Sequence, residues 1–135
     1  MAKVSLKKVI IPDILEATKA CIEFLSETDP NTGKHSGRTD DDRFRTWRQA
    51  ANLTPGFLAD DFMACYEKSG KNKSRLSNHM VRGCITFWLR VMRYEYGPHP
   101  CLVDGELLSL LRRWIELNDP EAQECSSKHP SQTGG

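Results

Sequence analysis

The sequence has no long hydrophobic run among its 135 residues. No apolar stretch approaches the roughly 18 residues that a transmembrane helix needs, which argues against a membrane-spanning helix. The apolar run Val9–Ile11 near the N-terminus is also too short for the hydrophobic region of a secretory signal. The five cysteines are an odd number without a tight spacing pattern, which favours reduced thiols. We therefore expect an intracellular protein, cytoplasmic or nuclear.

The signature motifs of common enzyme classes are absent as well. The sequence contains no GxxxxGKS/T, GxGxxG, HExxH or GxSxG pattern, so the usual phosphate, dinucleotide, zinc-protease and hydrolase sites are not indicated. It has no CxxC pair, and neither His79 with Cys84 nor His99 with Cys101 has the spacing of a zinc finger or knuckle. We expect a non-enzymatic protein with no cofactor and no metal. The sequence leaves open a Cys–His site that assembles only in space.

The cysteines follow the predicted helical periodicity. Cys21, Cys65 and Cys84 fall on apolar helix faces, where a cysteine usually acts as a small buried hydrophobe. We expect these three to be buried, and Cys101 and Cys125 to be exposed.

Glycine and proline divide the chain into helix-sized blocks. Within each block the apolar residues recur every three or four positions, which is typical of amphipathic helices. Capping residues before the apolar runs indicate helix starts, among them the acidic run ending at Asp42 and the pair Thr54-Pro55. The predicted helices cover residues 13–26, about 40–53, 55–69, 74–96 and about 104–118.

These patterns predict an all-α protein, a single compact bundle of about five helices. The fourth helix is the longest and has so much apolar surface that we expect it to be central. The helical domain is predicted to span residues 13–125. A basic N-terminal arm, 1–12, precedes it, and a disordered C-terminal tail, 126–135, follows it.

Charge is unevenly distributed along the chain. The formal net charge is only +1. Residues 68–93, however, hold seven basic and no acidic side chains, a net charge of +7. The flanking segments, 40–67 and 94–135, carry net charges of −3 and −4, and residues 1–39 carry +1. The near-neutral total therefore conceals a strongly basic segment between two acidic ones.

The basic side chains of this segment are spaced at helical intervals. From Arg75 to Arg93 the polar positions step by three or four residues, which places them on one narrow stripe of a helix. Arginines about one turn apart can contact successive phosphates. A smaller basic group surrounds Trp47 on the second predicted helix. The candidate nucleic-acid-binding residues are Lys71, Lys73, Arg75, Arg82, Arg90, Arg93, Arg43, Arg45 and Arg48.

This pattern supports a functional hypothesis and a structural alternative. The first hypothesis is a small RNA-binding protein, such as a viral accessory or nucleocapsid-type factor, that binds mainly to the phosphate backbone. Because the overall charge is near zero, its basic surface has to be local or built by a homo-oligomer. The alternative function is a helical interaction module, an adaptor or inhibitor, that binds an acidic protein. In the structural alternative, acidic side chains of the third and fifth helices neutralise the stripe inside the bundle.

Overall fold

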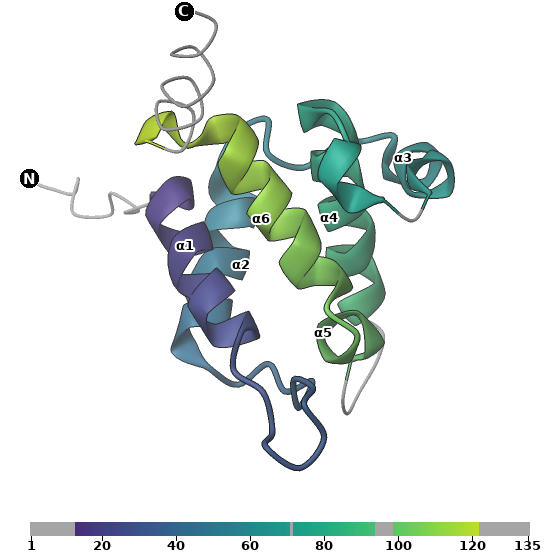
Figure 1. The fold of residues 1–135 in the computed structure, drawn as a ribbon. Helices are drawn as coiled ribbons and strands as arrows, with labels where there is room; N and C mark the ends of the chain where they lie inside the picture. Colours follow the sequence, from purple (N-terminus) through teal and green to yellow (C-terminus); the bar gives the residue numbers. More distant parts are fainter. Residues whose placement is uncertain (1–12, 71, 94–98, 122–135) are drawn as a thin grey trace, which may run out of the picture.

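The structure is a computed structural model that describes residues 13–70, 72–93 and 99–121 (Figure 1). These residues form helices and turns, with no strand among them, so the predicted all-α bundle is confirmed. The predicted arm 1–12 and tail 126–135 lie outside the described residues. None of the described helices is long and apolar enough to cross a membrane.

The bundle is organised around its last long helix. In Figure 1, α6 runs across the front of the molecule, with α1 and α2 on one side and α4 on the other. It packs against α1, α4, α5 and η2, whereas α4 packs mainly against α3 and α6. The predicted central position of the fourth helix is therefore not confirmed. The elements are α1 (Ile14–Leu25), α2 (Asp42–Leu53), α3 (Phe62–Ser69), the 3₁₀ turn η2 (Lys73–Arg75), α4 (Asn78–Met92), α5 (Pro100–Val103) and α6 (Glu106–Asn118).

Side-chain caps begin three of the helices. Asp13 accepts a hydrogen bond from Leu15 N (3.1 Å) at α1, and Asp41 accepts one from Arg43 N (2.8 Å) at α2. The Ser77 hydroxyl accepts one from the third residue of α4 (3.3 Å). Each cap satisfies a backbone N–H that has no partner inside the helix. The predicted start near residues 40–42 is therefore correct.

The third and fourth helices are shorter than predicted. Thr54-Pro55 does not start α3, because Gly56 adopts φ +79° and the chain turns, placing Phe57 in the core. Helix α3 begins only at Phe62. The fourth helix begins at Asn78 rather than at residue 74, since the chain forms η2 and is then extended before α4. The predicted continuation over residues 94–96 lies outside the described residues.

The fifth predicted helix, about 104–118, corresponds to α6, and the short helix α5 before it was not predicted. Gly105 separates the two helices. Its φ of +80° is in the left-handed region, which glycine tolerates without steric cost. The single turn of α5 therefore ends before it and α6 begins after it.

A chain of aromatic side chains forms the core between α1, α2 and α6. Phe24, Phe44, Trp47, Phe57 and Trp114 follow one another with ring centroids 5.6–6.5 Å apart. Trp47 is completely buried, so it is not available for stacking on a nucleobase. Burial of these large rings stabilises the bundle, because each removes a large apolar area from water.

The predicted burial of the cysteines is correct at Cys21, Cys65 and Cys84. Cys101 is also buried, which corrects its predicted exposure, because α5 packs this residue against α6. Cys125 lies outside the described residues.

Helices α3 and α4 cross at Gly83 and Cys65. A Cβ atom at Gly83 would overlap both the Cβ and the Sγ of Cys65. The missing side chain at Gly83 is therefore what allows the two backbones to approach so closely.

Gly83→Ala should destabilise the protein by about 1–3 kcal/mol, because the added methyl forces α3 away from α4. At an unconstrained helical site the same change would stabilise by about 0.5–1 kcal/mol. Urea unfolding measures the difference. A Cys65→Gly/Gly83→Ala double variant should recover part of the loss, and a stabilised Gly83→Ala single variant would contradict the close approach.

Acidification should also destabilise the fold through His35. This ring is buried in the loop between α1 and α2, where its Nδ1 accepts a hydrogen bond from Gly37 N (2.9 Å). Burial, together with the nearby charge of Arg38, lowers the pKa of His35 below its usual value. Its contribution is therefore complete above about pH 6.5 and is lost as the pH falls through the lower folded pKa. The urea midpoint should fall between pH 7.5 and 5.5 less steeply in His35→Asn, whose amide oxygen can still accept from Gly37 N.

Candidate functional site

The predicted basic stripe is interrupted in the folded protein. Thr86, at its middle, is fully buried, and its hydroxyl accepts from Ala59 N (3.0 Å) while donating to Arg82 O (2.8 Å). The Arg82 side chain is half-buried and donates from Nη1 to Gly56 O (2.7 Å). The segment between α2 and α3 therefore covers the middle of the stripe. Arg75 is exposed on η2 rather than on α4, and Lys71 lies outside the described residues.

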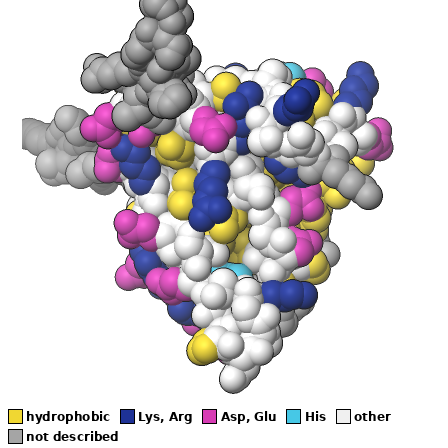
Figure 2. Space-filling model, in the orientation of Figure 1, with side chains coloured by type: hydrophobic (Ala, Val, Ile, Leu, Met, Phe, Trp, Pro, Cys, Tyr) yellow, Lys and Arg dark blue, Asp and Glu magenta, His cyan; other side chains and the backbone are white. Residues whose placement is uncertain are grey.

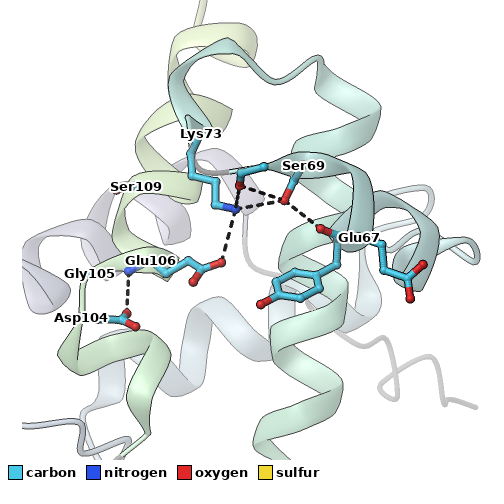
Figure 3. A pocket seen from close by; sticks show the side chains of 9 residues that line it. Glu67, Ser69, Lys73, Asp104, Gly105, Glu106 and Ser109 are labelled. Atoms are coloured by element: carbon cyan, nitrogen blue, oxygen red, sulfur yellow. Dashed lines mark hydrogen bonds and ion pairs between the residues drawn. The ribbon is translucent and has the colours of Figure 1, made fainter.

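The Lys73 ammonium group forms its contacts with other residues of the protein (Figure 3). Its Nζ lies 3.4 Å from Glu106 Oε2 and donates to Ser69 Oγ (3.0 Å) and Gly70 O (2.8 Å). The Lys73 side chain is only 12% exposed, beside a cavity of about 570 Å³ between α3 and the start of α6. Trp88 Nε1 donates to the same Glu106 oxygen (3.1 Å). Lys73 thus holds η2, α3 and α6 together rather than facing a ligand in solvent.

Two arginines of the smaller basic group are ion-paired. Arg43 contacts Asp41 through Nε (2.9 Å) and Glu27 through Nη2 (2.7 Å). The hydrogen bond from Arg43 lowers the pKa of Asp41 to about 2. Arg45 contacts Asp42 at 2.7 Å. Acids of α2, its N-cap and the loop after α1 therefore neutralise these two arginines. The structural alternative concerned the stripe and the acids of the third and fifth predicted helices, and it applies at Lys73, whose partner Glu106 belongs to the fifth.

Arg48 and Arg93 are brought together by the tertiary fold. They line one cavity of about 410 Å³ between α2 and the end of α4, with Thr39, Asn52 and His99 on its wall. Among the described residues neither arginine forms an ion pair. The Arg48 guanidinium lies 5.4 Å from the centroid of the Phe44 ring. This cation–π contact holds the guanidinium in place and leaves its positive charge unpaired with any acid among the described residues.

Arg90 lies on the same helix as Arg93, three residues earlier. It is exposed, and its guanidinium carbon lies 5.5 Å from the centroid of the Phe62 ring. Residues three apart on a helix are neighbours on its surface. On the face shown in Figure 2, by contrast, Lys and Arg side chains are spread across the view rather than gathered into one band.

Sequence reasoning missed one cluster of chemically active side chains. Asp61, Cys65 and His79 each place a potential metal-ligand atom within 4.8 Å of the other two. Asp61 and Cys65 are four residues apart at the start of α3, and this spacing alone is only weak evidence for a metal site. The third comes from α4, so only the packing of the two helices completes the group.

Comparison of the chain with protein-family models, curated proteins and solved structures gives no match. The functional interpretation therefore depends on the residues of this chain and their geometry alone. Of the nine predicted site residues, the fold gathers Arg48 and Arg93 at one cavity, whereas the exposed Arg90 lies over the Phe62 ring of α3. It engages Lys73, Arg82, Arg43 and Arg45 in internal contacts.

Lys73→Met should lower the free energy of unfolding by about 1–3 kcal/mol, because Glu106 loses its cationic partner in a largely buried setting. Lys68→Met, an exposed lysine on the same side of the bundle, should change it by less than about 0.5 kcal/mol. Chemical denaturation of both variants measures this contrast. Equal stability of the two variants would show that Lys73 does not hold α3 and α6 together.

Proposed function

We propose that the protein is a non-enzymatic RNA-binding protein that contacts phosphate groups through Arg48, Arg93 and Arg90. The observation that supports this most is the convergence of Arg48 and Arg93, from two different helices, on one cavity. Neither has an acidic partner among the described residues, so both charges are available to an anion from solution.

The chemistry of the cavity suits a phosphate group. Guanidinium groups present several N–H donors in a fixed plane and bind phosphate oxygens with two hydrogen bonds at once. Thr39 and Asn52 add a hydroxyl and an amide to the same wall. We infer that the exposed Arg90, three residues before Arg93, contacts the neighbouring phosphate of a strand.

We expect this surface to bind RNA without recognising its bases. Trp47 is buried, so the aromatic residue that the sequence placed among arginines does not offer a stacking surface. Phosphate contacts position a nucleic acid without reading its sequence. We therefore expect affinity that depends strongly on salt and weakly on base composition.

An acidic protein surface is the alternative partner, because carboxylates also bind arginine pairs. We favour RNA because Arg90 and Arg93 repeat along α4, which matches a polymer with regularly spaced charges. A homo-oligomer would extend this small surface by placing copies of the Arg48–Arg93 cavity side by side.

Fluorescence anisotropy with a labelled single-stranded RNA, measured over a range of salt concentrations, tests the proposal. Each lost phosphate contact lowers the slope of log K against log salt by about 0.7 for single strands. Arg48→Gln/Arg93→Gln should therefore lower the slope by about 1.4 and the affinity by about tenfold or more. Arg38→Gln/Arg45→Gln removes the same charge from two ion-paired arginines and is the matched control.

Absence of RNA binding by the unmodified protein at low salt would overturn the proposal. Equal losses in the two double variants would show that net charge, rather than the cavity, determines affinity. Binding to poly-glutamate that matches or exceeds binding to RNA would favour an acidic protein partner instead.

A further inference from the structure

Two pairs of residues face each other where α3 crosses α4. Asp61 and Cys65 lie one helical turn apart at the start of α3, and His79 and Gly83 lie one turn apart on α4. Because Gly83 has no side chain, Cys65 occupies the space directly against α4. The Cys65 thiol is therefore held beside the helix face from which His79 projects.

The three functional atoms of this cluster are close together. His79 Nε2 lies 2.9 Å from Asp61 Oδ2, and the Cys65 sulfur completes a group in which all atoms lie within 4.8 Å of one another. Among the described residues this is the one group of three such side chains with this geometry. A thiol, an imidazole and a carboxylate thus converge on one point.

The Asp61 carboxylate contacts His79 of α4 and makes no capping bond to the backbone of its own helix. Asp61 occupies the N-cap position of α3, yet its side chain makes no capping hydrogen bond. At the N-caps of α1 and α2, by contrast, Asp13 and Asp41 both bond to the backbone of their helices. At Asp61, the contact with His79 takes the place of the hydrogen bond that an N-cap side chain usually accepts from its own helix.

We propose that Asp61, Cys65 and His79 form a zinc-binding site, with a water molecule as the fourth ligand. Sulfur, imidazole nitrogen and carboxylate oxygen are the three ligand types that Zn²⁺ takes from proteins. Three protein ligands with one position left for water is a known arrangement for this metal. The cysteine thiol releases its proton to solvent when the Zn–S bond forms.

The separations between the ligand atoms need only small adjustments to accept the ion. Zinc–ligand bonds of about 2.0–2.3 Å in a tetrahedron place ligand atoms roughly 3.2–3.7 Å apart. The side chains of His79 and Asp61 are 57% and 55% exposed, so both are free to separate slightly around the metal. Cys65 is buried and provides the fixed ligand.

The surroundings leave room for the fourth ligand and tolerate the charge. A cavity of about 360 Å³ borders the cluster and is lined by Asp61, His79, Asp60 and Arg82. Water in this cavity can reach an ion held by the cluster. Zn²⁺ bound to one thiolate and one carboxylate is electrically neutral, which suits a position beside the Arg82 guanidinium.

The test is a titration of the reduced, chelator-treated full-length protein with Co²⁺, followed by displacement with Zn²⁺ and without RNA present. We expect thiolate-to-cobalt charge transfer in the near ultraviolet, visible bands typical of tetrahedral cobalt, and a rise in Tm on adding Zn²⁺. Cys65→Ser should abolish the thiolate band, and His79→Gln and Asp61→Asn should each weaken binding by more than about 100-fold.

Two matched controls make the assignment specific. Asp60→Asn removes the adjacent, exposed carboxylate and should leave metal affinity unchanged within about twofold. Cys84→Ala removes the neighbouring thiol, whose Sγ is directed to the Cys65 carbonyl (3.8 Å), and should retain the thiolate band. Circular dichroism of each variant establishes that it is folded. Absence of cobalt bands in the unmodified protein, or equal binding by Asp61→Asn and Asp60→Asn, would overturn the zinc site.

Discussion

The close approach of α3 to α4 at Gly83 is the constraint on which this side of the molecule depends. Because α4 has no side chain at this position, α3 lies directly on it, and Cys65 fills the space. The next residue of α3, Tyr66, stacks on Phe87, one turn after Gly83 on α4, with ring centroids 3.8 Å apart. The end of α3 then lies where Lys73 can connect the Ser69 hydroxyl and the Gly70 carbonyl to Glu106 of α6. The missing side chain at Gly83 thus permits the close packing on which the aromatic contact and the Asp61–Cys65–His79 cluster lie.

The distribution of charge follows from the same packing. The basic segment 68–93 contributes little continuous positive surface, because packing covers its middle at Thr86 and internal partners bind Lys73 and Arg82. Arg82 satisfies a backbone carbonyl, and Lys73 satisfies a carboxylate. What remains at the C-terminal end of α4 is a compact pair of arginines shared with α2, Arg48 and Arg93, rather than a long positive track.

The successes and failures of sequence prediction have physical causes. Helix starts at Asp13 and Asp41 were predictable because capping depends on residues within a few positions of one another. The start at Thr54-Pro55 was wrong because Gly56 allowed a turn that buries Phe57, a gain that depends on distant aromatic partners. Cys101 was misplaced for a similar reason, since the packing of α5 on α6 buries it.

Sequence alone determined that this chain forms amphipathic helices, because the spacing of apolar residues and caps is a local property. It also gave the relative angular positions of Arg82 and Arg90 on α4, although not that of Arg75, which lies on η2. Only the tertiary structure decided which of the basic side chains face solvent, because covering groups such as Ala59 and Glu106 come from other segments. It likewise paired Arg48 with Arg93 and completed the Asp61–Cys65 pair with His79. Periodicity specifies the direction in which a side chain points from its own helix, whereas long-range packing determines what it meets there.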